Sequence, residues 1–558
     1  MKKTLLFFFI LLQFFYHSTN AQLKYTNPIL EGFYPDPSIC RVGNDYYLIN
    51  STFAYFPGLP IFHSTDLVNW EQIGNAIDRN EQLDLANASV SGGLFAPTIR
   101  YNNGMFYIIC TCVNKGGNFI IKAKNPKGPW SNPVFLPDVN GIDPSLFFDD
   151  NGKVYITYNS IPPNNISQYQ GHRTIRIVEL DLQSFKVIGD NEIIVNGGVD
   201  ISKKPVWIEG PHLFKKDGLY YLISAEGGTG TNHSEVVFRS NAVKGPYIPY
   251  DNNPILTQRQ LDSKRIHPVS STGHADFVET QDGRWYSVFL GCRPYEKDYY
   301  NTGRETFLCP MEWKNGWPVI IQKGEAVNYK YNVPFSENTK KINNPFNGNI
   351  AFKDSFNSDK LNFRYVFLRN PSKKLYTLDV KKSGLTLNLK PITASQKSNP
   401  AFIGFRQPNS KGYAATSISF SANSENEKAG LLIFQNENHY YFVCKSIKNN
   451  QPVVELYKSS KEENATNELI ESVVLKDNSL PLQLKIEANN DQYSIYYSEN
   501  GDKYSLLKTV DGKFLSTNVA GGFVGCMYAM YATSNGNTTS NSARYNWFVY
   551  HGDDDIFK

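Results

Sequence analysis

The feature of this 558-residue chain that most limits its fold is a plan that occurs five times before residue 320. Each copy has an opening residue, then small residues or proline, an apolar strand, a turn and an aromatic strand. Neighbouring copies begin 47 to 66 residues apart, which leaves room for about four short strands in each. Four-stranded antiparallel units repeated around an axis form a β-propeller, so the sequence predicts one with five blades. The opening residues are Asp36, Ala96, Asp143, Glu209 and His274, and a tyrosine follows each after 11 or 12 residues.

Equivalent positions of the five copies should converge at one end of the propeller axis. Three of them are the carboxylic acids Asp36, Asp143 and Glu209, and a fourth is the imidazole of His274. Ordinary turns also use Asp, Gly and Pro, which is the alternative interpretation of any single copy. Three acids at one phase of a single repeat favour a functional cluster.

The second half of the chain lacks the fivefold plan but keeps a β pattern. Leucines alternate with polar residues at 385, 387 and 389, and Asn500 and Gly501 indicate a hairpin turn. Aromatic residues make up 14% of the chain, which favours pleated surfaces throughout. We therefore expect an all-β protein: a five-bladed β-propeller over 22–324, an Asn- and Pro-rich linker over 325–351, and a C-terminal β-sandwich over 352–558.

The N-terminus is typical of an export signal. Lys2 and Lys3 precede an apolar stretch that ends before small residues at 18–21, which predicts a signal peptide over 1–21 with cleavage near Ala21. The apolar stretch is too short to span a bilayer, and we expect no membrane span elsewhere. The protein is thus expected to be exported, to the periplasm or the medium. A net charge of +4 with scattered lysine pairs argues against a nucleic-acid partner.

Clustered carboxyl groups suit a specific chemistry. Like charges and partial burial raise at least one pKa, which places an acid beside a base. Glycosidic bond hydrolysis uses such a pair: one carboxylic acid protonates the leaving oxygen, and a carboxylate activates water or attacks carbon. Calcium binding through carboxylate oxygens is the main competing use of the same residues.

Several stretches resemble glycoside hydrolase family 43. Its three acid motifs are matched by residues 32–38 (GFYPDPS), 141–145 (GIDPS) and 208–212 (IEGPH). Residues 273–276 (GHAD) and 304–308 (RETFL) are also similar to that family, and residues 352–356, 400–404 and 435–441 resemble the C-terminal sandwich of its β-xylosidase-like members.

This resemblance implies an exo-acting, inverting β-xylosidase or α-L-arabinofuranosidase. Its substrate would be an oligosaccharide or polysaccharide of the plant cell wall, from which it releases xylose or arabinofuranose. Carried over to this chain, Asp36 would be the general base and Glu209 the general acid. Asp143 would raise the pKa of the acid and orient it.

The resemblance also suggests further pocket residues. His274 would lie on the channel axis, where relatives often hold a calcium ion or water; a core histidine is the alternative, and no cofactor is expected to be required. Arg293 would bind a sugar hydroxyl unless it forms a structural ion pair. Phe53 would line the pocket unless it is a core aromatic. Phe95, which stands where relatives usually have tryptophan, would line it too. Phe523 would reach the site from a sandwich loop.

Two other functions remain open at this point. An endo-arabinanase would need an open groove, and the appended sandwich favours a closed pocket instead. A non-catalytic carbohydrate-binding propeller would have no need of an acid and base pair. The sequence does not separate a xyloside from an arabinofuranoside, because the two sugars present similar hydroxyls.

Overall fold

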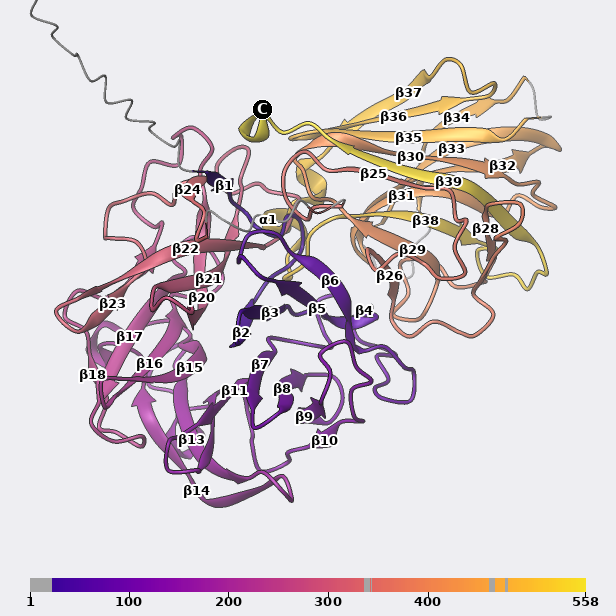
Figure 1. Ribbon diagram of the computed structural model, residues 1–558. Helices are drawn as coiled ribbons and strands as arrows, with labels where there is room; N and C mark the ends of the chain where they lie inside the picture. The colour runs from indigo at the N-terminus through magenta and orange to yellow at the C-terminus, as the bar shows by residue number, and fades with distance from the viewer. Residues whose placement is uncertain (1–22, 336–341, 343, 461–466, 477–479) are drawn as a thin grey trace, which may run out of the picture.

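The computed structural model describes residues 23–335, 342, 344–460, 467–476 and 480–558. The chain forms two β bodies (Figure 1): a ring of small sheets, coloured indigo to pink, and a layered pair of larger sheets in orange and yellow beside it. This confirms the predicted fold class, a five-bladed propeller followed by a sandwich. The predicted signal peptide, residues 1–21, lies outside the described residues.

Five antiparallel sheets form the blades of the propeller, each built from strands that follow one another in the chain, except that blade 1 skips β4. Blade 1 contains β2 (Ser38–Val42), β3 (Asp45–Ile49), β5 (Gly58–Ser64) and β6 (Glu71–Ile77). Blade 2 contains β7 (Thr98–Asn102), β8 (Met105–Cys112), β9 (Gly117–Ala123) and β10 (Val134–Phe135). Blade 3 contains β11 (Ile142–Phe148), β12 (Val154–Ser160), β13 (Thr174–Asp181) and β14 (Lys186–Asn196). Blade 4 contains β15 (Glu209–Lys216), β16 (Leu219–Glu226), β17 (Ser234–Ser240), β18 (Ile248–Pro249) and β19 (Leu256–Thr257). Blade 5 contains β20 (Ser270–Glu279), β21 (Trp285–Cys292), β22 (Glu305–Lys314) and β23 (Trp317–Val319).

The sandwich consists of two sheets of eight strands each, packed through their apolar faces. In the first, the path is β27 (Tyr376–Leu378), β28 (Leu385–Asn388), β39 (Ser542–Gly552), β30 (Lys411–Ser419), β35 (Leu482–Asn489), β36 (Gln492–Ser498) and β37 (Ser505–Asp511), with β25 (Ala351–Asp354) on β39. In the second, the path is β34 (Glu468–Val474), β33 (Gln451–Lys458), β32 (His439–Lys448), β31 (Lys428–Asn436), β38 (Met527–Thr533), β29 (Ala401–Arg406), β26 (Tyr365–Leu368) and β4 (Tyr55–Phe56).

Two strand pairs connect segments far apart in the chain. Strand β4 belongs to the propeller segment, yet it pairs antiparallel with β26 and so becomes the edge of a sandwich sheet. Strand β24 (Lys330–Asn332) pairs with β1 (Lys24–Thr26), so the segment predicted as a linker contains a strand that holds the start of the described chain. The two domains are therefore joined by backbone hydrogen bonds as well as by side-chain packing.

In the described parts of the chain, helical structure is limited to a few short turns. Among the described residues, no helix has the length and apolar character needed to cross a membrane. The short helical turns are α1 (Thr517–Ala520) and the 3-10 turns η1 (Pro163–Asn165), η2 (Ile201–Lys203), η3 (Lys513–Leu515) and η4 (Asp555–Phe557).

Candidate active site

A pocket of about 270 Å³ opens where the first residues of the blades meet. All the site residues predicted from the sequence line this pocket except Arg293. Ala96, the opening residue of the blade-2 repeat, lines it as well. The equivalent positions of the five copies thus converge as the repeat requires. The predicted residues that line it are Asp36, Phe53, Phe95, Asp143, Glu209, His274 and Phe523.

The local backbone explains why these side chains face the axis. Asp36, Asp143 and His274 have φ angles of 51°, 54° and 51°, a left-handed conformation that non-glycine residues adopt rarely and often at functional sites. The pairing of the inner strands shifts register beside Asp143, Glu209 and His274. Gly210 is required at its position because a side chain there would meet the His274 ring at 2.9 Å. The bulges therefore turn one polar side chain per blade toward the pocket.

Asp36 lies among groups that stabilise a carboxylate. The Ser51 hydroxyl donates a hydrogen bond to its Oδ2 atom. Its Oδ1 atom lies 3.5 Å from Nη1 of Arg304 and 3.6 Å from Nδ1 of His274. A hydroxyl donor and a guanidinium beside one buried carboxyl group suit an ionised base that accepts a proton from water.

Asp143 and Glu209 both have raised pKa values. Burial raises the pKa of Asp143 to about 6, although His274 acts to lower it. The Gly210 amide donates to Asp143 Oδ2 at 3.2 Å. Burial, and then the nearby Asp143 carboxylate, raise the pKa of Glu209 well above its ordinary value. A carboxyl group with a raised pKa suits a proton donor, and Asp36 lines the same pocket.

Three phenylalanines form one wall of the pocket. The ring centroids of Phe53 and Phe95 are 5.4 Å apart, and those of Phe95 and Phe523 are 6.0 Å apart. Phe523 comes from the sandwich, and its backbone amide donates to the Ser91 hydroxyl of the propeller at 3.0 Å. An apolar wall of this kind can contact the faces of a sugar ring, while the carboxyl groups hold its polar edge.

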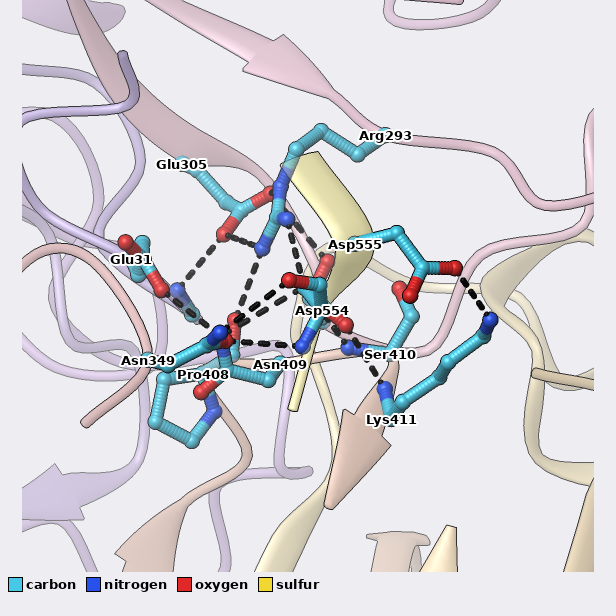
Figure 2. A network of polar contacts seen from close by, with 12 residues as sticks. Glu31, Arg293, Glu305, Asn349, Pro408, Asn409, Ser410, Lys411, Asp554 and Asp555 are labelled. Carbon is cyan, nitrogen blue, oxygen red and sulfur yellow. Dashed lines mark hydrogen bonds and ion pairs between the residues drawn. The ribbon is translucent and has the colours of Figure 1, made fainter. Parts of the chain in front are cut away.

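The position of Arg293 contradicts the prediction that it contacts sugar (Figure 2). Its guanidinium is buried between the two domains, with Nε and Nη2 donating to Glu305 at 2.6 and 2.9 Å. Nη1 donates to Asp554 at 2.8 Å, and Nη2 donates to the Pro408 carbonyl at 2.7 Å. It borders a different cavity, of about 320 Å³. The structural ion pair, which was the alternative interpretation, is the correct one.

Arg304 is the arginine that lines the pocket, and the sequence reasoning gave it no role. Besides its contact with Asp36, its guanidinium carbon lies 4.9 Å from the centre of the Phe523 ring. Arg304 opens the 304–308 stretch that resembles family 43, which is the signal that could have identified it. It is placed to hold both a substrate hydroxyl and the sandwich loop.

Trp207 is a second pocket residue that sequence reasoning missed. It has a φ angle of 58°, and its backbone amide donates to the Gly171 carbonyl at 2.8 Å. The guanidinium carbon of Arg173 lies 3.7 Å from the centre of its ring. A hydrogen bond from the Trp207 side chain acts to lower the pKa of Glu209. Its place two residues before Glu209 was the available clue.

The described side chains around His274 do not supply the carboxylate ligands that suit the calcium ion suggested by the resemblance. Calcium takes six to eight oxygen ligands. Within the described parts of the chain, no three His, Cys, Asp or Glu side chains are arranged to hold a metal. The nearest carboxylate to the His274 imidazole, Asp36, already has Ser51 and Arg304 as partners. We therefore derive no catalytic step through a metal.

Comparisons with known proteins agree with this geometry. The sequence model of glycosyl hydrolases family 43 matches residues 25–318, and that of the beta xylosidase C-terminal concanavalin A-like domain matches residues 353–551. A protein of Butyrivibrio fibrisolvens named xylosidase/arabinosidase is 40% identical over 530 residues, which cover 94% of this chain and 98% of that protein. A non-reducing end alpha-L-arabinofuranosidase of Bacteroides ovatus is 36% identical over 546 residues, 95% of each chain. A crystal structure of a GH43_12 protein retrieved from capybara gut metagenome is 41% identical, with a TM-score of 0.84 over 92% of this chain and 95% of that one.

Proposed function

Because this chain belongs to glycosyl hydrolase family 43, we propose that its pocket removes terminal xylose or arabinofuranose from xylan- or arabinoxylan-derived chains. The proposal is an exo-acting, inverting hydrolase. The observation that carries it is the pairing of Glu209, whose pKa is raised, with Asp36, which is flanked by a hydroxyl and a guanidinium.

In the proposed reaction, Glu209 donates its proton to the glycosidic oxygen as the bond from that oxygen to the anomeric carbon breaks. A water molecule attacks the anomeric carbon from the opposite side, and Asp36 takes a proton from this water. The sugar leaves with inverted configuration. Asp36 is then protonated and Glu209 ionised, and exchange with solvent restores both.

Asp143 has two proposed effects on the acid. Its carboxylate raises the pKa of Glu209, so the acid stays protonated when substrate binds. Its Oδ2 atom accepts a hydrogen bond from the amide of Gly210, the residue next to Glu209, which fixes the strand that carries the acid. Asp143 itself transfers no proton to substrate in this mechanism.

Exo action is supported by the apolar wall on one side of the pocket. The wall of Phe53, Phe95 and Phe523 includes a residue from each domain, so the sandwich covers one side of the site. A long chain running through an open groove, as an endo-arabinanase requires, would meet this wall.

Two relatives support different sugars: one bears the name xylosidase/arabinosidase, the other alpha-L-arabinofuranosidase. The decisive assay compares release of nitrophenol from the β-xyloside and the α-L-arabinofuranoside, with arabinoxylan as the polymer. We expect monosaccharide as the first product and little early loss of polymer viscosity. Early release of oligosaccharides from arabinan would instead reject the exo assignment.

We also propose that the protein works outside the cytoplasm on plant cell-wall carbohydrate. The support is the sequence of residues 1–21, with its two lysines, apolar stretch and small residues before the expected cleavage site. N-terminal sequencing of the exported protein should begin at Gln22. Retention of the protein in the cytoplasm would reject this proposal.

A further inference from the structure

Beneath the residues that line the pocket, the repeat places a second polar layer. Ser38, Ser145 and Asp276 stand two positions after Asp36, Asp143 and His274 in the chain, and His212 stands three after Glu209. In blade 4 this interval is therefore one residue longer, and the pairing of β15 with β16 shifts register between Glu209 and His212. Blade 2 adds Arg100, on the inner strand β7. The second layer therefore consists of Ser38, Arg100, Ser145, His212 and Asp276.

The Arg100 guanidinium connects this layer across the propeller axis. It forms a two-pronged ion pair with Asp276, Nη1 to Oδ2 at 2.8 Å and Nη2 to Oδ1 at 3.1 Å. Nη1 also donates to the Ser38 hydroxyl at 3.2 Å, and Nη2 lies 3.1 Å from Nδ1 of His212. One side chain thus contacts blades 1, 4 and 5 from blade 2, and Ser145 of blade 3 reaches the same His212 nitrogen at 3.1 Å.

The protonation states in the layer follow from these contacts. Burial would raise the pKa of Asp276, but the adjacent Arg100 outweighs it and holds that pKa at about 2. Burial lowers the pKa of His212 to about 3, so its ring is neutral. Since a guanidinium can only donate, the Nδ1 atom of His212 accepts and its proton is on Nε2. The layer therefore holds one cation and one anion, each with a partner.

Asp276 has no free oxygen to offer a metal ion. Its Oδ2 atom also accepts from the Ser38 hydroxyl at 2.7 Å and the Ile39 amide at 3.0 Å, and its Oδ1 atom accepts from the Phe277 amide at 2.9 Å. A calcium ion here would have to displace the guanidinium and compete with these donors.

We propose that Arg100 is a built-in cation that joins the blades at the propeller axis, so that this layer needs no bound metal ion. A planar, permanently charged guanidinium matches a carboxylate with two parallel hydrogen bonds, so it can bridge blades without a cage of oxygen ligands. This inference concerns the propeller's assembly and does not depend on which sugar the pocket accepts.

The first test uses the wild-type protein. After dialysis against EDTA, we measure its calcium content, its thermal midpoint Tm and its kcat/KM, then add calcium chloride. The proposal requires that Tm and kcat/KM stay the same at each step, with calcium well below one ion per chain. Loss of Tm or of activity on chelation, restored by one calcium per chain, would overturn it.

The second test replaces the cation. Arg100→Met leaves Asp276 buried without its partner, which should lower Tm by on the order of 10 °C. Arg41→Met is the matched control, because Arg41 is exposed on β2 and donates to the Gly43 carbonyl of its own turn. We expect Arg41→Met to keep the wild-type Tm, and Arg100→Lys, which retains a charge but loses the two-pronged geometry, to fall between.

If Arg100→Met yields no folded protein, the Tm of Arg100→Lys and the EDTA and calcium measurements on the wild type still test the proposal. Millimolar guanidinium added to Arg100→Lys or Arg100→Met should raise Tm relative to the same concentration of sodium chloride. A wild-type Tm in Arg100→Met would contradict the proposal, since the blades would then hold together without this cation.

Discussion

Phe523 of the sandwich stacks on Phe53 of blade 1, with ring centroids 5.8 Å apart and planes inclined by 25°. The pocket is therefore complete only when the two domains are docked. Two further contacts, the Phe523 amide on Ser91 and the Arg304 guanidinium on the Phe523 ring, fix the loop that carries it. We therefore expect the second domain to contact the substrate directly.

Replacing Phe523 tests this dependence. Phe523→Ala removes an apolar contact with the sugar worth about 1.5–3 kcal/mol, which corresponds to roughly a 10–100-fold loss of kcat/KM. The residue is only partly buried in the free protein, so Tm should change little. Val519→Ala, in the neighbouring turn α1 and 42% exposed, is the control and should keep both values. An unchanged kcat/KM in Phe523→Ala would exclude Phe523 from the substrate site.

The two arginines of blade 5 should respond differently to the same substitution. Arg304→Met removes a donor from the pocket, which should lower kcat/KM by about 10²–10³-fold. Arg293→Met breaks a buried pair with Glu305 and Asp554 and should cost about 3–5 kcal/mol of unfolding free energy. Its kcat/KM, measured on folded protein well below Tm, should stay near the wild-type value. If Arg293→Met lowers kcat/KM and Arg304→Met lowers only stability, Arg293 is the arginine that contacts the sugar.

The pH dependence of Asp143→Asn has a defined sign. Activity requires protonated Glu209, so kcat/KM falls as pH rises through the pKa of Glu209. In the wild type, ionised Asp143 raises that pKa. Without this negative charge Glu209 ionises more easily, and the alkaline limb of the profile should move to lower pH. A limb that stays in place or moves upward would show that Asp143 does not set the pKa of the acid.

Trp207→Phe should move the alkaline limb of the pH profile of kcat/KM to higher pH, opposite to the shift in Asp143→Asn. The Trp207 side chain donates to Glu209 and so stabilises its ionised form, which lowers its pKa. Phenylalanine keeps an aromatic ring beside Arg173 but loses the N–H donor, so the alkaline limb of kcat/KM should move to higher pH. A shift in the same direction as Asp143→Asn would reject the donor role of Trp207.

Much of this arrangement could be predicted because one pattern repeats. The positions of Asp36, Asp143, Glu209 and His274 follow from their shared phase, and each blade encodes its own strands and turns locally. Phe53, Phe95 and Phe523 were expected in the pocket by resemblance, and the structure places all three there.

The remaining features depend on contacts that local sequence does not encode. Arg293 directly follows β21 and Arg304 directly precedes β22, so spacing alone could not tell which guanidinium faces the pocket. The answer depends on Asp554, far away in the chain, which holds Arg293 between the domains. The pairing of β4 with β26 across the domains is nonlocal in the same way.

The most direct test of the account follows the stereochemistry of the wild-type reaction by proton NMR. Inversion through water held by Asp36 and acid catalysis by Glu209 predict that a β-xyloside yields α-xylose first, before mutarotation supplies the β anomer. This mechanism also requires the two carboxyl groups to be roughly 6.5–9.5 Å apart in the substrate complex. If β-xylose appears first, the enzyme retains configuration, and the roles assigned to Asp36 and Glu209 are wrong.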